Sequence, residues 1–176
     1  MKLGLMADSH DDAVAIRRAV GIFNREGVAL VLHAGDISSP QMALAFQYLH
    51  VPLIAICGNN DRDWHGLREA FARHGSVYSG YYETVLGGRR VALMHELRAL
   101  HLLPADRNYD VVVYGHTHHF ETRAGSYLLL NPGQCNLQFE GEATVAVLHL
   151  ETLEVQKFVL VKGTDAAAEP AGEEHP

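Results

Sequence analysis

Short apolar runs alternate with segments of helical periodicity in the first third of the chain. Each run is brief, rich in Val, Leu, Ile and Met, and ends at polar or glycine residues, as buried strands do. The predicted strands cover residues 2–7, 28–34 and 51–57. Between the first two, Asp11 or Asp12 can cap a helix that runs to about Glu26 and stops at Gly27. The positions of this helix that we expect to be buried are Ala15, Ile16, Ala19, Val20 and Phe23.

A second helix is predicted from Ser38 or Ser39 to about His50, because Pro40 stands where the first helical turn would begin. Strands that are separated by helices pair in parallel. The three strands therefore belong to one sheet, with their carboxyl ends along the same edge.

The rest of the chain is richer in strands. A short helix or irregular segment is predicted over 62–74 and a short helix over 97–103, before Pro104. Strands are predicted over 76–86, 90–94, 110–114, 121–124, 127–131, 143–150 and 153–161. A helix-and-strand half followed by a strand-rich third predicts two packed sheets with helices outside them, instead of one doubly wound sheet.

Composition is that of one globular domain: 48% of the 176 residues are hydrophobic and 20% are charged. No apolar run approaches the roughly 18 residues of a membrane-spanning helix. The first segment turns acidic at Asp8, too early for a secretory signal, so a cytoplasmic protein without a membrane anchor is expected. Cys57 and Cys135 are too few for a disulfide framework and are expected to be small buried side chains.

The formal net charge of −7 is unevenly distributed. Residues 164–176 contain four acidic side chains and no Lys or Arg, which leaves −3 for the rest. This mildly acidic body argues against an extended nucleic-acid footprint but allows a small phosphate ligand. Residues 163–176 are rich in Ala, Glu and Pro and are predicted to be a disordered acidic tail after a single domain over 1–162. The composition is compatible with a homo-oligomer.

Candidate metal ligands follow five of the predicted strands. Each lies in a polar turn, and the set is Asp8, His10, Asp36, Asn59, His95, His116 and His118. His116 and His118 are two residues apart, so in an extended chain both could reach one small volume, and Gly115 would let the backbone approach it closely. All donors are N or O atoms, which suits Mn²⁺, Fe, Co²⁺, Ni²⁺ or Zn²⁺. Seven ligands exceed the need of one tetrahedral ion and favour two ions that share a carboxylate.

These motifs in this order resemble the calcineurin-like metallophosphoesterases, in particular their small single-domain bacterial and archaeal phosphodiesterases. The resemblance covers residues 1–162 and rests on Asp-x-His, Gly-Asp, Gly-Asn-x-Asp, a lone His, Gly-His-x-His and the Asn-Pro-Gly turn at 131–133. It implies an α/β fold of four layers, α/β/β/α, in which helices flank two mixed sheets. It also implies a metal-dependent phosphodiesterase with two divalent transition-metal ions, of which manganese is favoured over Ni, Co, Fe or Zn.

The resemblance also implies roles for individual residues. Asp8, His10 and His118 would hold one ion, and Asn59, His95 and His116 the other. Asp36 would bridge the two ions, and Asp36, Asn59, Asn60 and His95 would be the catalytic residues. With two carboxylates and a bridging hydroxide the centre carries about +1, which favours a small phosphodiester anion as substrate. The metal-bridging hydroxide would attack the phosphorus in line.

Two positions depart from the family pattern. Asn60 stands where many relatives have a histidine, and an amide can donate a hydrogen bond to a phosphate but cannot supply a proton. Glu96 follows His95 where this branch often has Gly and then another His. Because Asn60 cannot supply a proton, we expect a preference for diesters with good leaving groups.

Other readings remain open. The same centre could serve a phosphomonoesterase or a protein phosphatase, and the same fold serves as a non-catalytic protein-binding scaffold in a retromer-associated relative. His33 is expected to be buried or to support a ligand, and Asp61 to orient a ligand or cap the backbone. The physiological substrate, the native metal and the oligomeric state do not follow from the sequence.

Overall fold

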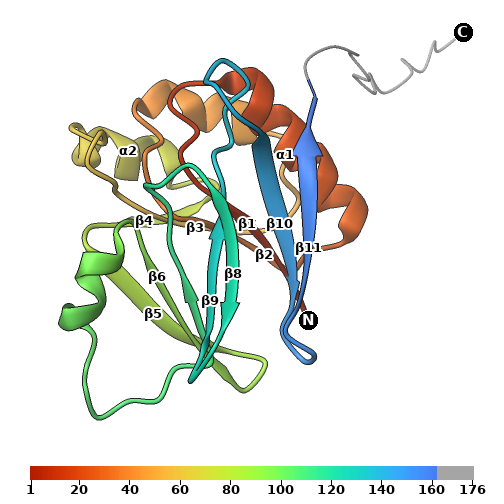
Figure 1. The fold of residues 1–176 in the computed structure, drawn as a ribbon. Helices are drawn as coiled ribbons and strands as arrows, with labels where there is room; N and C mark the ends of the chain where they lie inside the picture. Colours follow the sequence, from red (N-terminus) through yellow and green to blue (C-terminus); the bar gives the residue numbers. More distant parts are fainter. Residues whose placement is uncertain (162–176) are drawn as a thin grey trace, which may run out of the picture.

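Two mixed sheets face each other in the computed structural model, which describes residues 1–161. Sheet A has the strand order β11-β10-β1-β2-β3-β4, and sheet B has the order β5-β6-β7-β9-β8 (Figure 1). The strands of sheet A are β1 (Lys2–Met6), β2 (Leu30–His33), β3 (Leu53–Ile56), β4 (Gly75–Tyr78), β10 (Ala143–His149) and β11 (Glu154–Leu160). Those of sheet B are β5 (Tyr81–Leu86), β6 (Arg89–Met94), β7 (Val111–Val113), β8 (Phe120–Ala124) and β9 (Leu128–Pro132). The predicted pair of packed sheets is therefore confirmed.

Parallel pairing gives each sheet a common carboxyl edge. In sheet A, β1, β2, β3 and β4 are parallel, while β10 and β11 join antiparallel. In sheet B, β6, β7 and β9 are parallel, and β5 and β8 pair antiparallel at its two margins. The turns after β1, β2 and β3 therefore lie along the carboxyl edge of sheet A, and the turns after β6 and β7 lie along that of sheet B.

The helices cover the outer face of sheet A. α1 (Ala13–Glu26) and α2 (Trp64–Phe71) are α-helices, whereas η1 (Pro40–Phe46) is a 3-10 helix (Figure 1). The Asp12 side chain caps α1 by accepting from the N–H groups of residues 14 and 15, and Gly27 ends it in the left-handed conformation. The five positions predicted to be buried on α1 are all buried. Sheet B carries the 3-10 helix η2 (Leu97–Leu102) (Figure 1).

Two cores result from this layering. One lies between the helices and sheet A and includes Phe23, Phe46 and Phe71. The other lies between the sheets and includes Leu3, Leu32 and Val112. Cys135 is buried and Cys57 only partly so, and neither forms a disulfide. No helix within residues 1–161 has the length and apolar character needed to cross a bilayer.

Two predicted elements were wrong in extent. The helix expected up to His50 ends at Phe46, because the Asn24 side chain bonds the carbonyl of Tyr48 and the N–H of His50 and holds that segment in a turn. The strand expected over 76–86 is two strands, since the chain turns at Gly80 (φ 80°) and passes from sheet A to sheet B. Residues 162–176, which include the predicted acidic tail, lie outside the described part of the chain.

Candidate metal centre

The seven predicted ligand residues all lie at the carboxyl edges of the two sheets. Asp8 and His10 follow β1, Asp36 follows β2, and Asn59 follows β3. His95 follows β6, and His116 and His118 follow β7. Since the two sheets pack face to face, their edges bring turns from distant parts of the sequence to one place.

One set of donors, which we name the Asp8 group, consists of Asp8, His10 and His118. The Nε2 atoms of His10 and His118 are 3.3 Å apart. The Oδ1 atom of Asp8 lies 3.6 Å from Nε2 of His118 and 4.0 Å from Nε2 of His10. These atoms are close enough together to bind one metal ion.

A second set, the His95 group, consists of Asn59, His95 and His116. The Oδ1 atom of Asn59 lies 2.9 Å from Nε2 of His95 and 3.0 Å from Nδ1 of His116, and the two ring nitrogens are 3.3 Å apart. The other nitrogen of His95, Nδ1, lies 2.8 Å from the carbonyl oxygen of Ala34 and donates to it. Nε2 of His95 is thus the nitrogen that is free to bind a metal ion.

Asp36 lies between the two groups. Its Oδ2 atom is 3.6 Å from Nε2 of His10 and 3.5 Å from Nε2 of His95. The carboxylate is buried, and it also accepts from Asn60 through the backbone N–H at 2.8 Å and through the side-chain amide at 2.7 Å. Both Asn60 donors therefore point at Asp36 in this structure.

The chemistry of these donors fits divalent cations. Burial, with repulsion from Asp36 second, raises the pKa of Asp8 to about 8, as expected for carboxylates crowded together without a counter-charge. Burial lowers the pKa of His10 and of His118, so both rings are neutral at pH 7 and offer lone pairs. Facing lone pairs repel one another unless a cation or proton lies between them, and all the donors are N or O atoms.

The turns that carry the candidate ligands have an unusual backbone. Positive φ angles occur at Asp8 (51°), His10 (38°), Asp36 (58°), His116 (70°) and His118 (63°). A left-handed residue other than Gly costs about 1–2 kcal/mol, and such strain is concentrated at functional sites. The extended conformation assumed for His116 and His118 was therefore wrong. Because their backbone is left-handed, the two rings diverge to different donor groups.

Two glycines permit the close approach. A Cβ atom on Gly115 would lie 2.9 Å from Oδ2 of Asp8, and one on Gly58 would lie 2.2 Å from Oδ1 of Asp36. Any side chain at either position would collide with a carboxylate of the site. The absence of a side chain at Gly115 thus lets its backbone lie close to the Asp8 carboxylate.

Buried polar side chains fix the turns from behind. Asp61 accepts from the N–H groups of Asp36 (2.9 Å), Ser38 (2.6 Å) and Gly58 (2.7 Å), and so joins the turn after β2 to the turn after β3. Asn131 donates to the carbonyl of Gly115 (2.9 Å) and to the Thr117 hydroxyl (3.0 Å). Both residues hold the backbone of the candidate ligands in its strained form.

His33 joins the first two ligand turns. Burial lowers the pKa of this histidine to about 3, so the ring is neutral. Its Nδ1 accepts from the N–H of Gly35 at 3.2 Å, so Nε2 carries the hydrogen and donates to the Ser9 hydroxyl at 3.0 Å. The expected burial of His33 is confirmed, and its contacts hold the Asp8 turn against the Asp36 turn.

Sequence reasoning missed two residues beside the Asp8 group. The Phe139 ring lies parallel to the ring of His118, at 5° and 5.6 Å between centroids, and 5.1 Å from that of His10. Asn136 is buried and accepts from the N–H of Phe139. Both lie in an irregular loop without periodicity, so no local pattern marked them.

Comparison with known proteins agrees with this architecture. Residues 1–153 match the model of the calcineurin-like phosphoesterase superfamily domain. A phosphodiesterase of Methanocaldococcus jannaschii is 33% identical over 166 residues, which cover 91% of this chain and 99% of the relative. Phosphodiesterase YfcE of Escherichia coli K12 is 27% identical over 171 residues, which cover 88% and 91% of the two chains.

Solved structures give the same picture. That of a novel archaeal phosphodiesterase is 32% identical and has a TM-score of 0.83, covering 91% of this chain and all of its own. Vps29 of Entamoeba histolytica complexed with Zn²⁺ is 18% identical with a TM-score of 0.65, covering 93% and 95%, which shows a common fold alone. On the family match and the archaeal relative together, the chain belongs to the calcineurin-like phosphoesterase superfamily.

Proposed function

We propose that this protein is a metal-dependent phosphodiesterase that binds two divalent transition-metal ions and hydrolyses a small phosphodiester by in-line displacement with water. The observation that carries the proposal is the position of Asp36, whose Oδ2 atom lies at 3.5–3.6 Å from a histidine nitrogen of each donor group. A single carboxylate between two three-residue groups is the arrangement that a bridged pair of ions requires. The names of the archaeal and E. coli relatives support the reaction class.

Each residue of the site has a separate role in this proposal. The Asp8 group would hold one ion, the His95 group the other, and Asp36 would contact both. When bound, the two ions would lower the pKa of a water molecule towards neutrality and offset the charge that develops on the phosphoryl oxygens. His33, Asp61 and Asn131 hold the turns in place so that the donor atoms need not reorganise during the reaction.

Asn60 sets the expected substrate preference. Its amide can share a hydrogen bond between Asp36 and a phosphate oxygen, but it has no proton to give to a departing alkoxide. The enzyme should therefore favour diesters whose leaving group departs without protonation, such as phenols with electron-withdrawing substituents.

Metal analysis and ester hydrolysis test the proposal together. Chelator-treated protein would be reloaded with Mn²⁺, Co²⁺, Ni²⁺ or Zn²⁺, and the ions per chain would be measured alongside rates on bis(p-nitrophenyl) phosphate and p-nitrophenyl phosphate. We expect two ions per chain and faster hydrolysis of the diester. Faster hydrolysis of the monoester would assign a phosphomonoesterase instead. Less than one ion per chain at saturating Mn²⁺, with neither ester hydrolysed, would refute an enzyme and favour a scaffold.

A further inference from the structure

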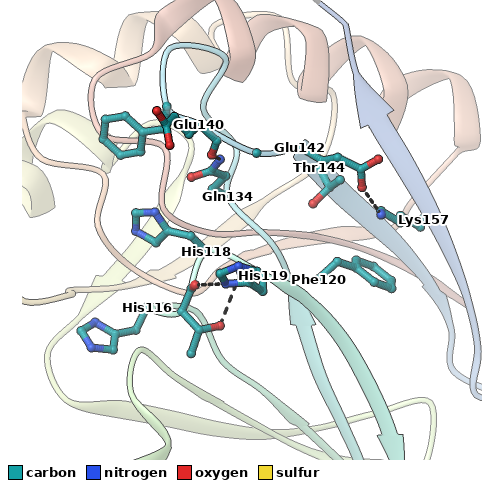
Figure 2. A pocket seen from close by; sticks show the side chains of 12 residues that line it. His116, His118, His119, Phe120, Gln134, Glu140, Glu142, Thr144 and Lys157 are labelled. Atoms are coloured by element: carbon teal, nitrogen blue, oxygen red, sulfur yellow. Dashed lines mark hydrogen bonds and ion pairs between the residues drawn. The ribbon is translucent and has the colours of Figure 1, made fainter.

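A cavity of about 780 Å³ opens beside the Asp8 group (Figure 2). His116 and His118 lie at one end of it, and Phe120, Thr144 and Lys157 lie at the other end, on the strands β8, β10 and β11 (Figure 2). The volume falls within the range of about 300–1,000 Å³ that small-molecule sites occupy. A phosphate bound between the two donor groups would have one of its organic groups facing this cavity.

The wall next to the metal ligands is aromatic and rigidly held. Phe139 packs against the rings of His10 and His118, yet 42% of its surface is exposed. Its loop is fixed because Asn136 accepts from the N–H groups of residues 138 and 139 and donates to the carbonyl of Ser9 at 3.0 Å. An exposed phenylalanine anchored in this way offers a flat apolar face to a bound ring.

The far end of the cavity is polar but carries little positive charge. Nζ of Lys157 lies 2.5 Å from a carboxylate oxygen of Glu142 and 5.1 Å from the centroid of the Phe120 ring. Glu142 neutralises the ammonium, and Glu140 adds a further negative charge to the lining. A second phosphate would be repelled here, whereas an uncharged group could stack on an aromatic ring and use the ion pair as donor and acceptor.

We infer that this cavity binds one organic group of the phosphodiester, and that this group is an uncharged ring system with hydrogen-bonding edges, the chemistry of a nucleoside. The inference rests on the proposed function, because the metal centre is what would place the phosphate at the mouth of the cavity. The ring of this group stacks on Phe139. The Glu142–Lys157 pair forms hydrogen bonds with the polar edge of the ring and excludes additional anionic groups.

Esters with one leaving group and different second groups test this assignment. In the Mn²⁺-loaded protein, kcat/KM would be compared for thymidine 5′-(p-nitrophenyl phosphate), ethyl p-nitrophenyl phosphate and the thymidine ester with an added 3′-phosphate. We expect the thymidine ester to exceed the ethyl ester by about tenfold or more, the effect of one base stacked on an aromatic ring. The 3′-phosphate should remove that advantage.

Three variants locate the effect. Phe139→Leu should reduce the ratio of thymidine to ethyl ester towards one, and the ratio is the readout because Phe139 also contacts metal ligands. Glu142→Lys should restore kcat/KM for the 3′-phosphorylated ester relative to the unmodified thymidine ester. Glu69→Lys, the same charge change on the exposed surface of α2 away from the cavity, should alter neither ratio.

Failure of the inference differs from failure of the proposed function. If the thymidine and ethyl esters are hydrolysed equally well and Phe139→Leu changes nothing, the cavity assignment is overturned while the phosphodiesterase stands. If no ester is hydrolysed, the proposed function fails, and binding of thymidine 5′-(methyl phosphate) then decides the cavity by NMR titration. The assignment is supported if the ligand binds the wild-type protein and Phe139→Leu weakens that binding about tenfold. It is overturned if the wild-type protein shows no binding or if Phe139→Leu leaves the affinity unchanged.

Discussion

The Asp8 group and the His95 group differ in charge and in burial. The Asp8 group includes a fully buried carboxylate, and the side chains of His10 and His118 are 14% and 32% exposed. The His95 group has a neutral amide in place of the carboxylate, and the side chain of its His116 is 46% exposed. Besides Asp36, the carboxylate of Glu96 also approaches this group, 3.9 Å from Nε2 of His116. The two ions would therefore experience different sites, although Asp36 lies at similar distances from both.

This difference shows how one carboxylate can couple unequal sites. The buried anion of the Asp8 group should bind its ion more tightly, because charge attraction is stronger away from water. The more exposed His95 group should exchange its ion more readily and be the side from which solvent reaches the centre. Three predictions test the contrast, beginning with the residue that both groups share, and a fourth concerns Asn60, which donates to that residue.

Asp36→Asn should have the largest effect. The substitution removes the negative charge between the two groups and keeps the shape of the side chain. The affinities for both ions should therefore fall together. We expect phosphodiester hydrolysis to fall by at least about 10³-fold. Metal content per chain and rates on bis(p-nitrophenyl) phosphate measure this. Asp106→Asn, at an exposed position outside the site, should leave both unchanged, and retention of two tightly bound ions in Asp36→Asn would contradict the bridging role.

His118→Ala should lower the affinity of the Asp8 group for its ion by about 100-fold or more, because it removes a direct ligand. His116→Ala should lower the affinity of the His95 group for its ion to a similar extent. With Co²⁺ as a paramagnetic probe, the Nδ1–H of His95 should remain shifted in His118→Ala, because this proton is held on Ala34 beside the intact His95 group. In His116→Ala that signal should broaden or move, whereas signals of His10 should persist. Loss of the same set of signals in both variants would contradict the division.

Metal affinity of the Asp8 group should depend on pH. Below the pKa of about 8 of Asp8, an incoming ion must displace a proton, so affinity should fall about tenfold for each pH unit from 8 down to 6. His10 and His118 should release fewer protons than ordinary histidines would, because burial lowers their pKa values. Calorimetric Mn²⁺ titrations in buffers of different ionisation enthalpy count the released protons. Proton-independent binding of the tighter ion between pH 6 and 8 would show that Asp8 is not its ligand.

Asn60→His should have the smallest effect and should act on the leaving group alone. A histidine that can donate a proton should raise the rate severalfold for diesters with poor leaving groups and little for those with p-nitrophenol. The increase should stay below the roughly 10²-fold that an optimally placed general acid contributes at least. A series of aryl and alkyl diesters across pH 6–9 measures this. If sensitivity to leaving-group pKa is the same in both proteins, Asn60 does not limit protonation of the leaving group.

The family fold and the location of the site could be predicted from local patterns. Short apolar runs separated by a capped helix dictate parallel strands, and parallel strands bring polar turns to one edge. Asp8, Asp36, Asn59, His95, His116 and His118 were all predicted as candidate ligands in this way, because each lies in the turn that follows an apolar strand, and the structure brings these turns together. The buried face of α1 was likewise predictable, since its apolar positions follow the helical period and Asp12 and Gly27 mark its ends.

Tertiary structure decided what depends on contacts between distant segments. The sequence by itself could not show the turn at Gly80 that moves the chain between sheets, nor the Asn24 contacts that end η1 early. The resemblance had assigned His116 and His118 to different ions, but the sequence could not show the left-handed backbone at both residues that directs their rings to different donor groups. Phe139 gained its place through Asn136, which is hydrogen-bonded to the Ser9 carbonyl more than a hundred residues away. The strand pattern predicts where candidate ligands lie along the chain, whereas only packing determines which of their atoms face each other.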